Sequence, residues 1–261
     1  MKRLIYQVYV GKRRRLYDHC TNSVKKYCEE HGIDHVVQRT PILMIKPDPF
    51  MTNRHPRATQ PLGCLPIFEK ECAFAHWPKY DQIAIVDSDI WIRPGAPNIF
   101  EEMECNCDFG GVVERQMPLT QQHRKSVDSY AQAQYRSLRD VEWNWEKNNG
   151  ADYINMGMML MNKSFEKYLK GETPHQFLRR SEFKPFIDGK GNWKWSTDQT
   201  LLNWWIRKER MKIKQLDWKW NALYTAIDND KIKEAYFVHF FKQQSLPHNG
   251  ENIEELMKLV G

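Results

Sequence analysis

The sequence has no run of 18 or more consecutive apolar residues, the length from which a membrane-spanning helix is recognised. Its start also lacks the charged, apolar and small-residue segments of a secretory signal peptide. Both absences argue against a protein anchored by transmembrane helices. We therefore expect a cytoplasmic protein with no membrane span.

Cysteine patterns that bind metals or build disulfide frameworks are missing too, because none of the six cysteines belongs to a C-x-x-C pair. Several, such as Cys20, Cys28 and Cys72, fall at apolar positions of predicted helices, as reduced core residues do. Internal repeats and low-complexity tracts are absent as well. These absences exclude a zinc module, a disulfide-rich domain and a repeat protein. With 261 residues, the chain is long enough for one large α/β domain or two small ones.

A formal net charge of +6 fits a polyanionic partner. The strongest basic run is Lys12-Arg13-Arg14-Arg15, directly after the first predicted strand. A nucleic-acid surface would add further basic clusters with stacking aromatic residues, so we predict no nucleic-acid partner. The run is interpreted as a solvated surface, with contact to a phosphate as the alternative.

The hydrophobic pattern predicts alternating strands and helices in the first half of the chain and a mixed order later. Strands are expected over residues 4–10, 36–37, 80–92, 109–113, 153–161, 211–216 and 235–241. Helices are expected over 16–32, 66–77, 99–103, 127–138, 164–169, 174–180 and 252–260. A further helix is expected to begin at Ser196, which opens an S-x-x-Q capping box ending at Gln199. This order favours a single Rossmann-like α/β domain with a mixed, mainly parallel central sheet flanked by helices.

The segment Tyr80–Ile92 carries the strongest functional signal. Its apolar run 83–86 suits a strand covered on both faces, and Asp87 and Asp89 follow at the carboxyl end. Ligands of open α/β sheets bind at that edge, and two neighbouring carboxylates need a cation, basic groups or water between them. We therefore hypothesise a divalent metal that holds a diphosphate. The alternative is a solvated turn with two helix-capping acids.

Two later features point to a binding cleft. Residues 46–66 are rich in proline and basic residues, including Arg54, His55 and Arg57, and form a long loop of the kind that often covers or binds a ligand. Gly157 interrupts a predicted central strand, as expected where another group approaches the backbone closely. Paired tryptophans, among them Trp193 and Trp195, are interpreted as core residues or as platforms for sugar rings.

Four segments occur in an order that resembles glycosyltransferase family eight, whose members have the GT-A fold. They are PIFEKECAFAHWPKYDQIAIVDSDIWIRPGAPNIFEE with its D-x-D, INMGMMLMN, TDQTLLN and VHFF. The family also places a tyrosine seven residues before the first aspartate, as Tyr80 precedes Asp87. The resemblance covers roughly residues 64–245.

The resemblance implies a transferase that moves a sugar from a nucleotide-sugar donor, with a UDP-sugar favoured, to a glycan or other hydroxyl acceptor, with retention and with Mn²⁺ or Mg²⁺. It implies one domain over 1–261, with a nucleotide-binding half over 1–114 and an acceptor-side half over 115–261. For the metal, it implies the ligands Asp87, Asp89 and His239, and for catalysis it implies Asp198 and Gln199. The residues implied to contact the nucleotide or diphosphate are Tyr9, Gly11, Lys70, Ser88 and Lys242. Those implied to contact the donor sugar or acceptor are Asn155, Gly157, Glu114 and Trp195.

The residue types agree with this assignment, because hard cations take carboxylate oxygens and Mn²⁺ also accepts an imidazole nitrogen. Some positions differ from the family pattern. Lys242 stands at the place of its glycine three residues after the histidine, and Ser245-Leu246-Pro247 stands at its Lys-Pro-Trp, so Lys242 is the candidate for the lysine expected on the diphosphate. Trp195 replaces an acidic residue. Asp198 is also explained by the helix dipole, and His239 by burial in the core.

Two other functions remain as alternatives. A phosphatase of the haloacid dehalogenase type also uses D-x-D, but it carries the pair on its first strand, and Trp91 replaces its small residue. A non-catalytic carbohydrate-binding module would explain the tryptophans but has no need of the two aspartates and His239 together.

Overall fold

The computed structural model describes residues 1–59, 62–146, 150–195 and 197–261. Within these residues, one sheet of six strands has the order β2-β1-β3-β6-β5-β7. β6 runs antiparallel to β3 and β5, and the other pairs are parallel. The strands are β1 (Arg3–Val8), β2 (Asp34–Gln38), β3 (Gln82–Val86), β5 (Phe109–Val113), β6 (Ile154–Asn162) and β7 (Ile213–Gln215). The predicted mixed, mainly parallel sheet is confirmed.

A second sheet of three strands in the described residues has the order β4-β9-β8. Its strands are β4 (Ile90–Ile92), β8 (Ala222–Leu223) and β9 (Phe237–His239). The prediction of one continuous strand over 80–92 was therefore wrong. The chain leaves the large sheet after Val86 and enters the small sheet at Ile90, because the two carboxylates between them face a cavity instead of continuing a buried ladder.

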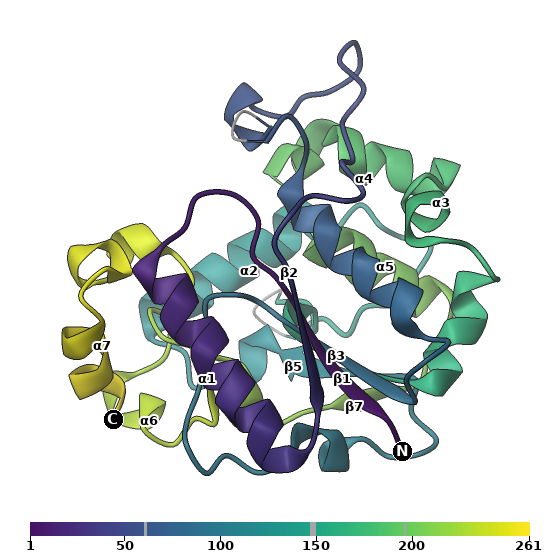
Figure 1. The fold of residues 1–261 in the computed structure, drawn as a ribbon. Helices are drawn as coiled ribbons and strands as arrows, with labels where there is room; N and C mark the ends of the chain where they lie inside the picture. Colours follow the sequence, from purple (N-terminus) through teal and green to yellow (C-terminus); the bar gives the residue numbers. More distant parts are fainter. Residues whose placement is uncertain (60–61, 147–149, 196) are drawn as a thin grey trace.

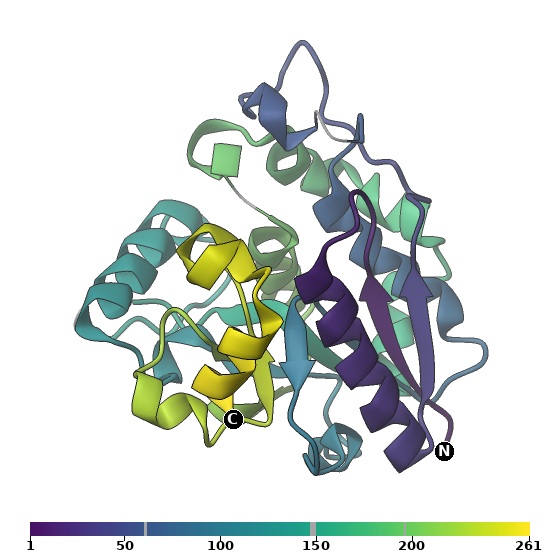
Figure 2. The ribbon, with the colours of Figure 1, turned by 60° about the vertical axis from the view of Figure 1, so that its left-hand side comes forward.

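The helices cover both faces of the large sheet. Strand order places β2 and β3 on opposite sides of β1, so right-handed crossovers put the two connecting helices on opposite faces. Accordingly, α1 (Arg15–His31) packs on β2 and β4, whereas the 3₁₀ segment Pro66–His76 packs on β1 and β3 (Figures 1 and 2). α7 (Ile253–Val260) lies along α1, and α5 (Asp198–Lys208) packs on β6. The remaining α-helices are α2 (Gln121–Tyr135), α3 (Pro174–Leu178), α4 (Lys184–Asp188) and α6 (Asn229–Ile232).

Helix α1 forms as the sequence predicts. Its apolar residues at helical spacing, including Leu16, Cys20 and Val24, are buried, and Gly32 ends the helix with φ of +64°, a conformation that glycine adopts without strain. All six cysteines are free, and Cys105 is the exposed one. None of the described helices has both the length and the apolar character needed to cross a bilayer.

The predicted long loop crosses the top of the molecule in Figure 1 and contains the short 3₁₀ turn Pro56–Ala58. Its Arg54 is buried, and its guanidinium donates hydrogen bonds to the carbonyls of Phe186 at 2.7 Å and Ile187 at 2.6 Å. These carbonyls belong to the last turn of α4, and that of Phe186 also accepts a hydrogen bond from the N–H of Gly189 at 3.2 Å. Arg54 therefore fastens the loop to α4.

Candidate active site

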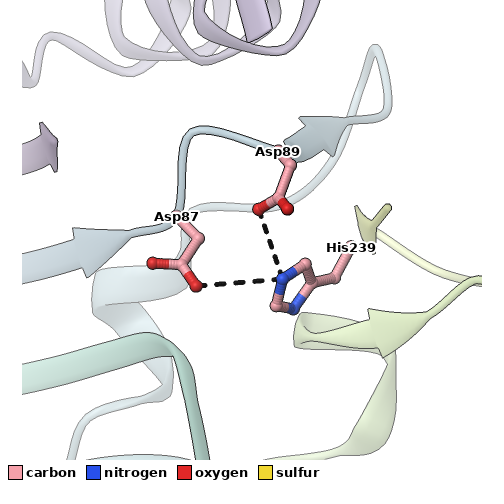
Figure 3. A group of neighbouring side chains, drawn as sticks. All are labelled: Asp87, Asp89 and His239. Atoms are coloured by element: carbon pink, nitrogen blue, oxygen red, sulfur yellow. Dashed lines mark ion pairs between the residues drawn. The ribbon is translucent and has the colours of Figure 1, made fainter. Parts of the chain in front are cut away.

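Asp87, Asp89 and His239 converge at the point where the two sheets meet (Figure 3). Asp87 follows β3, Asp89 precedes β4, and His239 ends β9, which pairs with β4 so that Ile90 lies opposite His239. Nε2 of His239 lies 3.3 Å from Oδ1 of Asp89 and 3.8 Å from Oδ2 of Asp87. All three ligand atoms lie within 4.8 Å of one another.

The three side chains line a cavity of about 430 Å³. Most of the predicted site residues line it as well: Lys70, Ser88, Asn155, Gly157, Asp198, Gln199 and Lys242. They come from five separate segments of the chain, so the fold, and not the local sequence, brings them together. The D-x-D is therefore not a turn pointing into bulk solvent.

The cavity concentrates charge that a cation would balance. Burial raises the pKa of Asp87, and the charge of Asp89 adds to this rise while Lys70 opposes it. Burial also acts to raise the pKa of Asp89, but His239 lowers it below its ordinary value. For His239, burial acts to lower the pKa, yet Asp89 and Asp87 raise it above its usual range. Two carboxylates and one imidazole nitrogen within reach of a common point fit Mn²⁺ or Mg²⁺.

Lys70 connects this group to the amino terminus of α5. Its Nζ lies 2.7 Å from Oδ1 of Asp87, 3.0 Å from Oδ2 of Asp198 and 3.1 Å from the carbonyl oxygen of Met156. The carbonyl of Met156 accepts a hydrogen bond from this ammonium group, and the two carboxylates form ion pairs with it. Burial acts to lower the pKa of Lys70, but Asp198 and Asp87 raise it above its usual range. The lysine is thus a charged bridge between the two acids.

The start of α5 places Asp198 and Gln199 in the cavity. Ser196, predicted as the helix cap, lies outside the described residues. Oγ1 of Thr197 accepts a hydrogen bond from the N–H of Gln199 at 3.2 Å and caps the helix, so Gln199 is its second residue and not its third. Oε1 of Gln199 accepts a hydrogen bond from the N–H of Met156 at 3.1 Å. This bond ties the helix to β6.

The absence of a side chain at Gly157 makes room for the imidazole ring of His239, one of the three candidate metal ligands. A β-carbon at this position would lie 2.4 Å from Cε1 and 2.6 Å from Nδ1 of His239. The predicted close approach to Gly157 is confirmed, and the approaching group is the imidazole ring. The carbonyl of Gly157 also accepts a hydrogen bond from the N–H of Asp87 at 2.8 Å. One glycine therefore contacts both the first aspartate and the histidine.

Glu114 lies behind the cavity wall. Its Oε2 accepts a hydrogen bond from Nδ2 of Asn155 at 2.8 Å, and its Oε1 lies 3.8 Å from Nε2 of His123. Asn155 in turn accepts a hydrogen bond from Nδ2 of Asn221 at 2.9 Å, and Oδ1 of Asn221 lies 3.1 Å from Nδ1 of His239. Asn221 was not predicted, because a single asparagine after W-x-W has no sequence signal of a ligand site.

The two predicted nucleotide contacts of the first turn lie beside the cavity. Tyr9 is buried, its hydroxyl accepts a hydrogen bond from the N–H of Arg14 at 2.6 Å, and Arg39 covers its ring at 4.1 Å. Gly11 lies in the following turn with φ of +95°. Both neighbours of Tyr9, Val8 and Val10, line the cavity.

Sequence reasoning also missed Tyr17, which lines the cavity from α1. Burial, followed by the nearby charge of Asp89, raises its pKa to about 12. The sequence did contain a signal for Tyr17. Because α1 follows the parallel strand β1, it begins at the carboxyl edge of the sheet, where ligands bind.

Trp195 lies in an adjoining cavity of about 470 Å³. Its side chain is 64% exposed. The two cavities share Pro66, Ile67 and Thr197 in their walls. The tryptophan therefore lies next to the cavity of the aspartates without lining it.

No model of a known protein family matches this chain, and no curated protein matches it. Several solved structures do match this chain. Galactosyltransferase LgtC, in complex with donor and acceptor sugar analogs, superposes with a TM-score of 0.58 at 13% identity, over 99% of this chain and 95% of that chain. The fold is that of GT-A glycosyltransferases.

Two further structures have the GT-A fold of this chain. One is a glycosyltransferase involved in the glycosylation of the major capsid of PBCV-1, with a TM-score of 0.54 and 14% identity over 98% of this chain and 100% of that chain. The other is mouse xyloside xylosyltransferase 1, with a TM-score of 0.52 and 12% identity over 95% of this chain and 100% of that chain. The resemblance found in the sequence is thereby confirmed for the GT-A fold.

Proposed function

We propose that this protein is a metal-dependent glycosyltransferase that moves a sugar from a nucleotide-sugar donor to a glycan or other hydroxyl acceptor. One observation carries the proposal: in a GT-A fold, Asp87, Asp89 and His239 direct their ligand atoms at a common point within one cavity. The phosphatase and the non-catalytic carbohydrate-binding module receive no support from the three similar structures.

Asp87, Asp89 and His239 would hold Mn²⁺ or Mg²⁺. When bound, the ion neutralises negative charge on the departing nucleoside diphosphate. Ser88 and Lys242 line the same cavity, and we propose that they contact the diphosphate. Contact between the diphosphate and Lys70 stays a prediction, since the acids and the carbonyl of Met156 already surround its ammonium group.

The walls of the cavity differ in character, and this difference supports an orientation for the donor. Val8, Val10 and Tyr17 form an apolar and aromatic wall, on which a nucleobase can stack. Asn155 and the start of α5 form a polar wall, which suits the hydroxyl groups of a sugar. We propose that the nucleoside lies on the first wall and the donor sugar on the second. The preference for uridine comes from the family resemblance.

The transfer breaks the bond between the anomeric carbon and the diphosphate oxygen, whose electron pair leaves with the nucleoside diphosphate. The acceptor hydroxyl oxygen forms the new bond to that carbon, and its proton goes to the departing phosphate oxygen. If configuration is retained, as the resemblance implies, the protein needs no general base. Asp198 and Gln199 would then orient the donor sugar, with Lys70 fixing Asp198 at 3.0 Å.

The acceptor has a suitable place beside the donor. The adjoining cavity shares part of its wall with the cavity of the aspartates and presents the exposed ring of Trp195. Aromatic rings provide flat apolar surfaces on which sugar rings pack. We propose that Trp195 contacts the acceptor glycan there and that Glu114 supports Asn155 from behind.

Hydrolysis of nucleotide sugars without an acceptor tests the proposal. A panel of UDP-, GDP- and other nucleotide sugars is incubated with the protein and Mn²⁺ or EDTA, and nucleoside diphosphate release is measured. We expect slow, Mn²⁺-dependent release from one donor class, and loss of that release in Asp89→Ala. Release that EDTA leaves unchanged, or hydrolysis of phosphomonoesters instead, would refute the assignment.

A further inference from the structure

Four buried polar side chains form a continuous line that ends on His239. They are Glu114, Asn155, Asn221 and His239, all less than 9% exposed. Consecutive members lie 2.8, 2.9 and 3.1 Å apart. Buried polar groups in such lines must each find a partner, so the direction of every hydrogen bond in the line is constrained.

The direction follows from one group that can only donate. The backbone N–H of Gly157 donates to Oδ1 of Asn155 at 3.0 Å, so this oxygen is an acceptor and Nδ2 of Asn155 faces Glu114. Oδ1 of Asn155 also accepts from Nδ2 of Asn221. Asn221 must therefore present its own Oδ1 to His239. An amide oxygen only accepts, so Nδ1 of His239 carries a hydrogen.

We infer that Asn221 is a positioning residue that fixes the tautomer and ring orientation of His239. With the hydrogen held on Nδ1, the lone pair of neutral Nε2 points at Oδ1 of Asp89 and Oδ2 of Asp87. That is the position proposed for the cation, so this inference rests on the proposed function. Partners of metal-ligating histidines act in this way, and their loss typically weakens metal binding.

The test compares the full chain with Asn221→Leu, which removes the acceptor, and Asn221→Asp, which keeps an oxygen for Nδ1–H. Mn²⁺ affinity is measured by calorimetry without nucleotide, and the tautomer by long-range proton–nitrogen NMR of the metal-free protein at a pH where the ring is neutral. We expect the Nδ1–H tautomer in the wild type and in Asn221→Asp. In Asn221→Leu we expect a loss of that tautomer and about 10- to 100-fold weaker Mn²⁺ binding.

Asn162→Leu is the matched control. Asn162 is a buried amide at the opposite end of β6 from Asn155, and its Oδ1 accepts a hydrogen bond from Nε2 of Gln82 at 2.9 Å. It should lose stability but keep its Mn²⁺ affinity. A wild-type ring with hydrogen on Nε2 would overturn the inference, even if Asn221→Leu does not fold. Equal affinity in Asn221→Leu and the wild type would overturn it as well. A wild type that binds no Mn²⁺ would instead refute the proposed metal site, while the NMR result still decides the tautomer.

Discussion

The imidazole ring of His239 packs against the backbone of Gly157, where a β-carbon would come within 2.4 Å of the ring atom Cε1. Gly157 belongs to β6 of the large sheet, and His239 ends β9 of the small sheet. The missing side chain thus lets the two sheets approach closely enough for the histidine to reach the aspartates.

Substitution Gly157→Ala should displace the ring of His239, because a buried ring atom and a β-carbon cannot share this space. We expect weaker Mn²⁺ binding, with a stability loss on the order of 2 kcal/mol, as overpacking typically costs. Gly110→Ala is the control, since the nearest atom to its β-carbon is Sδ of Met103 at 3.2 Å, on a flexible side chain. Calorimetric Mn²⁺ titration of both variants checks this, and unchanged affinity in Gly157→Ala would contradict it.

Asp198→Asn separates donor orientation from metal binding. Asp198 contacts Lys70 and lines the cavity, but it is not among the three candidate ligands. We expect Mn²⁺ affinity to stay within about threefold and donor hydrolysis to fall by about 100- to 1,000-fold, as loss of a preorganised electrostatic contact does. If the acid serves only a structural role, through its buried ion pair with Lys70 and the helix dipole, stability falls and hydrolysis is unchanged. Single-turnover hydrolysis and thermal unfolding distinguish the two results.

Glu71 should make stability depend on pH. Both of its carboxylate oxygens are buried without a hydrogen-bond partner in the described part of the chain, and burial, followed by the charge of Asp198, raises its pKa well above 4.5. Because the pKa of Glu71 is higher in the folded than in the unfolded protein, the folded protein holds the proton more tightly. The free energy of unfolding therefore falls as the pH rises above 4.5, by up to about 1.4 kcal/mol per pH unit.

Replacing Glu71 by Gln removes this titration. The stability of Glu71→Gln relative to the wild type should therefore increase between pH 5 and pH 7 in denaturant unfolding. The exposed Glu101 provides the control variant, Glu101→Gln, for which we expect no such increase. A pH-independent difference for Glu71→Gln would show that the acid is already ionised in the folded protein.

Local sequence signals predicted much of the fold, and the family resemblance supplied most of the predicted residues that line the cavity. The buried strand β3 ends directly before Asp87, α1 ends directly before Gly32, and the glycine in β6 marks a close approach, each as the pattern indicates. His239 was predicted through the family resemblance, since an imidazole among aromatic residues looks by itself like a core residue.

Long-range relationships were beyond the reach of the sequence. The division of 80–92 between two sheets depends on the pairing of Ile90 with His239, which no local pattern encodes. The bridge from Lys70 to Asp198 and the line through Asn221 likewise join distant segments. The proposed metal ligands also come from both predicted halves of the chain, 1–114 and 115–261.

The central claim, that Asp87, Asp89 and His239 hold a cation for a nucleoside diphosphate, is tested most directly by thermal unfolding of the wild type and Asp89→Asn. A ligand that binds only the native state raises the unfolding temperature. We expect Mn²⁺ with a nucleoside diphosphate such as UDP to raise the unfolding temperature of the wild type, EDTA to abolish this rise, and Asp89→Asn to show none. An equal rise in Asp89→Asn, or a rise that EDTA leaves intact, would contradict the account.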